Sequence, residues 1–361
     1  QTDVVVADVN ASGADATAIG SIAITSVTGN VTVNDEDADG VAVITNGSGT
    51  IEIDAALNVQ ANANIQSELG SVTITSGEAT TQGADVELAT AGGDIAVTAG
   101  TTITVETGGA ATSNGGDITY NGEDDVIVGD VSASGADTTA TGSIAITSVT
   151  GNVTVNDEDD DGIAVVTNGS GNVDVSAALN VQANANIQSE SGSVTVTSGE
   201  ATAQGADVEL TTAGGDIAVT AGTTITVETG GAATSNGGDI TYTGEADVVV
   251  ADVNASGADA SATGSIAVTS VTGNVTVNDE DDDGIAVITN GVGTIEIDAA
   301  IDVQANANIQ SELGSVTITS GEATTQGADV ELATAGGDIA VTAGTTITVE
   351  TGGAATSNGG N

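Results

Sequence analysis

The chain has 361 residues, of which 52 are Asp or Glu, and it contains no Lys, Arg or His, so its formal net charge is −52. Ion pairs within the chain are therefore excluded, and so is direct nucleic-acid binding, which relies on positive charge. Because Cys is absent as well, disulfides, thiolate metal sites and nucleophilic sites based on Cys or His are impossible.

A high net charge with low complexity is typical of disordered chains, but a regular alternation of Val and Ile and a hydrophobic content of 39% predict a folded protein. The longest aliphatic runs, at residues 4–7 and 248–251, are far shorter than the ~20 residues of a membrane helix. We expect no membrane span and no signal peptide. The chain does not start with Met and stops partway through a repeat, which indicates a piece of a longer protein; a processed terminus at Gln1 is the alternative.

Internal repetition is the dominant feature of the sequence. The segment GSIAIT begins at Gly20 and again at Gly142, and its variant GSIAVT begins at Gly264, so both intervals are 122 residues (142 − 20 and 264 − 142). We predict repeat units at residues 3–124, 125–246 and 247–361, the last incomplete, within one continuous solenoid. Residues 51–116 and 295–360 are nearly identical, which indicates recent duplication.

In chain order, the first repeat divides into segments that end in Gly, and we expect each to form one coil, about five coils per repeat. Each segment opens with a short apolar-alternating strand, and most contain a second. A similar opening every 20 to 30 residues is typical of a stack of coils, so we predict an all-β fold, a parallel β-helix (β-solenoid). The expected coils are residues 21–40, 41–70, 71–93, 94–116 and 117–142.

The alternation also predicts which side chains face inward. In the expected coil at residues 94–116 the inward residues are Ile95, Val97, Ile103 and Val105. In the second repeat, Val173 and Val175 replace the expected inward pair of residues 51 and 53 and keep them β-branched, while the outer positions exchange one polar group for another. The chain has only two aromatic residues, Tyr120 and Tyr242. A β-sandwich core normally contains large aromatic side chains, so this composition favours a narrow coil filled by smaller side chains.

The segment at residues 55–69 lacks the Gly breaks found elsewhere and is the best candidate for a helix. We interpret it as another side of a coil, and a short helix is the alternative. The expected inward residues are Leu57, Val59 and Ile65, and the expected outward residues are Asn58, Gln60, Asn62 and Asn64.

One acidic motif recurs in every repeat, with three aspartates at alternate positions followed by Gly. Such carboxylates suit Ca²⁺, which takes six to eight oxygen ligands, and the alternative is a solvated acidic turn. The candidate metal ligands are Asp35, Asp37 and Asp39, then Asp157, Asp159 and Asp161, then Asp279, Asp281 and Asp283.

The sequence gives little support for catalysis. Paired carboxylates can in principle hydrolyse a glycosidic bond, but the chain has no strong base and few aromatic rings to hold a sugar, so we predict no enzyme. Outward Thr pairs such as Thr73 and Thr75 also allow an ice-binding interpretation, which unequal coil lengths disfavour. Asn10, Asn30 and Asn46 lie in Asn-x-Ser/Thr sequences that can accept glycans.

The repeated segments GSIAITSVTGNVTV and GGDIAVTAGTTITV resemble those of giant repetitive bacterial surface proteins of the filamentous-haemagglutinin or large-exoprotein type. The resemblance covers the whole chain, in the style of its repeats. It implies a secreted, right-handed parallel β-helix that serves as an adhesin stalk or extracellular fibre. The chain lacks the basic residues of that family and shows neither its secretion domain nor a receptor-binding tip, which favours the shaft.

We therefore expect a structural segment of a long extracellular or cell-surface fibre. Its expected partners are other copies or further repeats of the same chain, end to end or laterally, and divalent cations. The alternatives are a calcium-dependent adhesin built of separate β-sandwich repeats and a cation-sequestering matrix protein.

Overall fold

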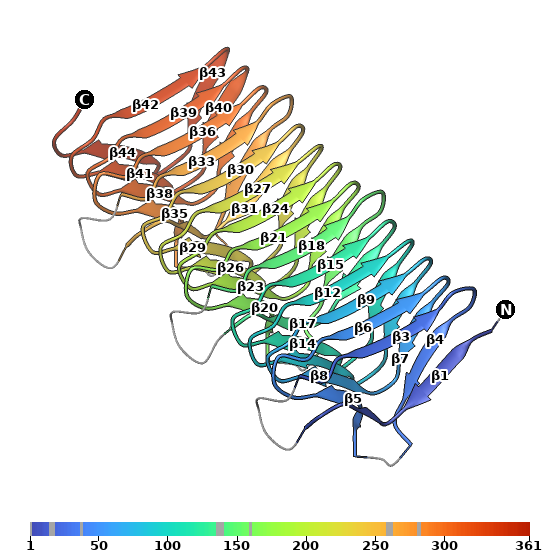
Figure 1. The fold of residues 1–361 in the computed structure, drawn as a ribbon. Coiled ribbons are helices and arrows are strands. Elements are labelled where there is room, and N and C mark those ends of the chain that lie inside the picture. The colour runs from blue at the N-terminus through green and yellow to red at the C-terminus, as the bar shows by residue number, and fades with distance from the viewer. Residues whose placement is uncertain are drawn as a thin grey trace. The chain divides into compact units, whose positions relative to one another are not determined.

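The computed structural model describes residues 2–13, 19–36, 39–134, 141–158, 161–257, 263–279 and 283–361. These residues contain no helix, and they form a β-solenoid of about 14 turns (Figure 1). Each complete turn supplies one strand to each of three parallel sheets, A, B and C. The predicted fold class is confirmed.

The chain divides into two compact units, and the first contains Gln1–Leu179 and Ala185–Ser189. Sheet A of this unit consists of β1 (Val4–Ala7), β4 (Val31–Asn34), β7 (Val59–Ala61), β10 (Thr80–Gln82), β13 (Ile103–Val105), β16 (Val126–Val128) and β19 (Val153–Val155). Sheet B consists of β2 (Val9–Asn10), β5 (Val41–Thr45), β8 (Asn64–Ser67), β11 (Glu87–Thr90), β14 (Ala110–Ser113), β17 (Asp130–Ser132), β20 (Ile163–Thr167) and β23 (Asn186–Ser189). Sheet C consists of β3 (Ile22–Ser26), β6 (Ile51–Ala55), β9 (Val72–Ser76), β12 (Ile95–Ala99), β15 (Ile118–Gly122), β18 (Ile144–Ser148) and β21 (Val173–Ala177).

The second unit contains Asn180–Asn184 and Glu190–Asn361. Its sheet A consists of β22 (Val181–Ala183), β25 (Thr202–Gln204), β28 (Ile225–Val227), β31 (Val248–Ala251), β34 (Val275–Asn278), β37 (Val303–Ala305), β40 (Ala323–Gln326) and β43 (Thr346–Val349). Sheet B consists of β26 (Glu209–Thr212), β29 (Ala232–Ser235), β32 (Val253–Asn254), β35 (Ile285–Thr289), β38 (Asn308–Ser311), β41 (Glu331–Thr334) and β44 (Ala354–Ser357). Sheet C consists of β24 (Val194–Ser198), β27 (Ile217–Ala221), β30 (Ile240–Gly244), β33 (Ile266–Ser270), β36 (Ile295–Ala299), β39 (Val316–Ser320) and β42 (Ile339–Ala343).

Stacking places like residues on like, as sheet C of the first unit shows. Ile51 of β6 is in register with Ile22 on one side and Val72 on the other, and Ile95 follows Val72 on the next strand. These columns form the core, in which Ile51 is 0% exposed, whereas Glu52 beside it is exposed. The alternation of inward and outward residues is confirmed here, and in β12 and β13 Ile95, Val97, Ile103 and Val105 are all buried.

The boundary between the first two predicted coils was wrong. The strand after the acidic motif, β5, lies in sheet B, while the strand that continues the sheet C column from β3 is β6. The predicted break at Gly40 falls inside a turn, because this glycine, at φ +87°, closes the loop that leads from sheet A into sheet B. Each turn also has a third strand, which a count of two strands per coil missed.

The segment at residues 55–69 forms strands β7 and β8 instead of a helix. Val59 and Ile65 are buried as predicted. The prediction that Leu57 faces inward was wrong, because this residue lies in the turn between β6 and β7 and is only half-buried. Next to it, the Asn58 side chain donates a hydrogen bond from Nδ2 to Asn30 Oδ1 (2.9 Å) and accepts one from the Ala79 backbone N (3.0 Å). This asparagine therefore joins three successive turns.

The two tyrosines are the largest side chains of the core. Tyr120 on β15 is 1% exposed and donates its hydroxyl to Gln82 Oε1 on β10 (3.1 Å). The Gln82 amide in turn donates to the carbonyl oxygens of Val86 and Ala110, both at 2.7 Å. Tyr242 and Gln204 repeat this arrangement at 3.3 Å. Each pair satisfies its buried polar atoms within the core.

Burial raises the pKa of both tyrosines above their usual value, and the tyrosines are the only side chains of this composition that titrate above neutral pH. Above about pH 10 the unfolded chain loses phenolic protons that the folded chain retains. The contribution of the buried tyrosines to the free energy of unfolding is therefore fully present below this pH. Above it, the free energy of unfolding falls by about 1.4 kcal/mol per pH unit for each tyrosine. We expect tyrosinate absorbance to appear only together with unfolding, followed by circular dichroism. Ionisation near pH 10 in a folded chain would contradict this.

Candidate functional site

The acidic motifs lie in the loops that lead from sheet A to sheet B. In the first loop, one carboxylate oxygen of Asp35 accepts a hydrogen bond from the Gly40 backbone N (2.7 Å), and Asp39 accepts one from the Val41 backbone N (2.9 Å). Both bonds close the loop on itself, as Asp side chains commonly do in turns. Asp37, the middle residue of the predicted set, lies outside the described residues.

The later loops repeat this geometry. The first aspartate of each loop, Asp157 or Asp279, accepts a hydrogen bond from the backbone N of the closing glycine at 2.7 Å. The last, Asp161 or Asp283, accepts one from the backbone N two residues on, at 2.8 and 2.7 Å. The predicted ligands Asp159 and Asp281 lie outside the described residues. The outer aspartates of each set therefore have a structural role in closing the loop.

A further aspartate lies close to each loop, and sequence reasoning missed it. Asp8, on the preceding turn, lines the same surface hollow of about 330 Å³ as Asp39. Asp130 and Asp161 line the equivalent hollow in the second repeat. The sequence did contain a signal for this further aspartate, because an aspartate recurs at the repeat interval just after a sheet A strand. Within the described residues, no group of three or more carboxylates is placed to hold a metal ion.

A second kind of hollow lies on the outer face of sheet B. In the first unit it has a volume of about 370 Å³ and is lined by the outward side chains of β5, β8, β11 and β14. These stack in register as Ile44, Gln66, Ala89 and Thr112. The short Ala89 side chain between two longer ones leaves the space.

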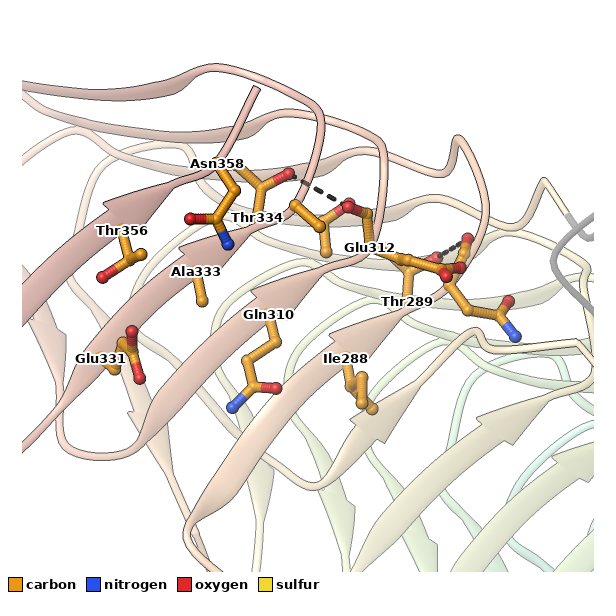
Figure 2. Close-up of a pocket in the computed structure, with 12 residues that line it drawn as sticks. Ile288, Thr289, Gln310, Glu312, Glu331, Ala333, Thr334, Thr356 and Asn358 are labelled. Atoms are coloured by element: carbon orange, nitrogen blue, oxygen red, sulfur yellow. Dashed lines mark hydrogen bonds between the residues drawn. The ribbon is translucent and has the colours of Figure 1, made fainter. Parts of the chain in front are cut away.

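The same hollow, of about 350 Å³, recurs in the second unit on β35, β38, β41 and β44. Figure 2 shows Ala333 between Gln310 and Thr356, with Ile288 on the far side of Gln310. Here too the floor is apolar and the rim is polar, and we call these two spaces the alanine hollows.

Two glutamates lie at opposite ends of each alanine hollow. In the first, Glu87 is half-buried at the start of β11, and Glu68 follows the end of β8, where its Oε2 accepts a hydrogen bond from the Gly47 backbone N (2.7 Å). In the second, Glu331 and Glu312 take these places, and Glu312 Oε2 accepts from the Gly291 backbone N at 2.9 Å. Since the chain has no cationic side chain, only groups from outside the chain can neutralise these carboxylates.

The alanine hollows were not predicted, although the second repeat carried a signal. At the position of Ala89 and Ala333 it has Thr211, and at the position of Leu69 and Leu313 it has Ser191. The two leucines, 52% and 46% exposed, directly follow the rim glutamates. An exchange of apolar for polar residues at outward positions indicates a surface that differs between repeats. An apolar floor between carboxylates is suited to binding a ligand that is both apolar and cationic.

Comparison with family models, with curated proteins and with solved structures finds no match to this chain. Among the described residues, no helix is long and apolar enough to cross a membrane.

Proposed function

We propose that the chain is a shaft segment of a long extracellular or cell-surface fibre, of the filamentous-haemagglutinin or large-exoprotein type, and that it works as a structural element and not as an enzyme. The observation that carries the proposal is the like-on-like stacking of parallel strands, in which Ile22, Ile51, Val72 and Ile95 form one column. Each further turn of such a stack buries the apolar side chains of its neighbour and extends three hydrogen-bond ladders, so stability grows with repeat number.

Strand direction bears on the alternative of separate β-sandwich repeats. Sandwich domains are built from antiparallel sheets, whereas the strand pairs described in both units are parallel. Other copies or further repeats of the chain, end to end or laterally, are the partners that a stacked shaft requires.

Oriented fibre diffraction tests the shaft. We expect a reflection near 4.8 Å, the spacing of paired strands, along the long axis of the fibre, because the strands of a solenoid lie across that axis. Chains with two, three and four repeats should give the same reflection and increasing resistance to urea. A spacing of about 40 Å along the axis without the 4.8 Å reflection is the pattern of separate domains and would refute the shaft.

A second proposal concerns calcium. The presence of Asp8 and Asp39 around one hollow, and of Asp130 and Asp161 around the next, favours a divalent ion there. An ion bound only by the folded chain stabilises it in proportion to the logarithm of the ion concentration. A cation-sequestering matrix role would use the same loops.

We expect millimolar Ca²⁺ to raise the unfolding temperature more than NaCl at the same ionic strength. Asp to Asn changes at the three motif aspartates of each loop should remove this excess, since Asn Oδ1 can still accept the hydrogen bond from Gly40 N while the charge is lost. Scanning calorimetry measures both effects. Equal stabilisation by the two salts would leave the loops as solvated turns.

A further inference from the structure

The alanine hollows combine three features that no single metal ion or neutral sugar would use together. Their floor is mainly apolar, with Ile44, Ala89 and Ala91 in the first unit, and Gln66 lies between Ile44 and Ala89. Glutamates lie at both ends, and an exposed leucine, Leu69, directly follows the glutamate at one end. Leu69 lies over Gly92, because a Cβ added there would meet Leu69 Cδ2 at 4.0 Å.

The separation of the two glutamates defines the length of a ligand. Leu88 is in register with Ile65, so Glu87 is in register with Asn64, and Glu68 lies four residues further along the preceding turn. At about 3.3 Å per residue and 4.8 Å between strands, the two Cα atoms are roughly 14 Å apart. A single ion cannot bridge this distance, whereas an extended chain with a cationic group at each end can.

Charge complementarity identifies the chemical class of that chain. The carboxylates of Glu68 and Glu87 find no cation within the protein. Glu87 is half-buried, which weakens the screening of its charge by water, whereas Glu68 is exposed. Methylene groups between amines would cover the floor, as the stems of long cationic side chains cover apolar surfaces elsewhere.

We propose that each alanine hollow binds a linear aliphatic polyamine, with an ammonium group at each glutamate and methylene groups on the Ile–Ala floor. The site is independent of the shaft function proposed above. The first and third repeats have it, and the second repeat provides natural replacements, Thr211 for the floor alanine and Ser191 for the bordering leucine. Among the described residues, Thr211 Oγ1 is buried without a hydrogen-bond partner.

Titration calorimetry of the full chain with spermine, in buffer of about 0.15 M ionic strength to weaken diffuse attraction, tests the proposal. We expect two equivalent sites per chain that are distinct from weaker background binding. Ala89→Thr with Ala333→Thr adopts the second repeat's residue without changing the charge, and should weaken these sites at least tenfold. Glu87→Gln with Glu331→Gln should weaken them to a similar extent.

A matched control is available on sheet C. Ala96 lies between Thr73 and Thr119 in register, on an outward position, so Ala96→Thr with Ala340→Thr makes the same chemical change away from the hollows and should leave spermine binding unchanged. Circular dichroism establishes that each variant is folded. Equal affinity of the wild-type and Ala89→Thr/Ala333→Thr chains would refute the proposal, as would displacement of spermine by Mg²⁺ as effectively as by 1,10-diaminodecane, because both results describe a diffuse counterion atmosphere.

Discussion

Replacing Val97 with Asp is expected to destabilise the protein by several kcal/mol, whereas Thr98→Asp on the same strand should cost less than about 1 kcal/mol. Val97 is 1% exposed and stacks between Ile74 and Tyr120, while Thr98 is exposed. A carboxylate at position 97 would be surrounded by apolar side chains. No Lys, Arg or His exists anywhere in the chain to pair with it, so it must either remain charged at a high cost or bind a proton.

The comparison is made by urea unfolding of the two variants and the wild type, followed by circular dichroism. The two variants have the same net charge, so general repulsion contributes equally to both, and the difference between them reports whether the replaced side chain faces inward or outward. Equal losses of stability would show that the assignment of inward and outward residues is wrong.

The inward residues could be predicted from the sequence because the period of a strand is local. Ile95 and Val97 alternate with Asp94, Ala96 and Thr98. The second repeat keeps β-branched Val at positions 173 and 175, where the first repeat has Ile. Burial of one face requires nothing beyond this pattern. The same reasoning favoured a side of a coil over a short helix at residues 55–69, where β7 and β8 are found.

Register between turns was harder to predict, because a Gly break can lie either between turns or within one. Gly40 and Gly70 look alike in the sequence. Gly40 closes the acidic loop through its bond to Asp35, whereas Gly70 stacks directly on Gly49 at a corner of the solenoid. Only the three-dimensional arrangement separates these roles. Because Gly40 was taken as a break between turns, β5 was predicted in the wrong sheet.

The alanine hollows could not be predicted because they depend on which outward residues of successive turns become neighbours. Gln66, Ala89 and Thr112 are more than 20 residues apart in sequence and adjacent in space. The acidic loops were found because their residues are adjacent in sequence. Asp8 was missed because it reaches the loop from the preceding turn.

The second large loss of stability is expected from Gly93→Ala. Gly93 belongs to a column of glycines, with Gly70 on the preceding turn and Gly116 on the next, and a Cβ at position 93 would overlap the backbone carbonyl of Gly70. Relief would require the turns to separate at this corner. The hydrogen bond from Ser113 Oγ to the Gly93 carbonyl oxygen (2.8 Å) would be strained by the same movement. We expect a loss of about 3 kcal/mol or more, at or above the upper end for overpacking.

Gly83→Ala is the matched control, because it makes the same change at another corner of the same unit. A Cβ there would meet the Ala61 carbonyl oxygen at 3.0 Å, a contact that a shift of a few tenths of an ångström relieves. Its cost should be about 1 kcal/mol or less, since Ala also restricts the unfolded chain. Urea unfolding gives both values. If the two variants lose the same stability, close stacking of glycines does not determine the spacing of turns, and the corner is able to accommodate a side chain.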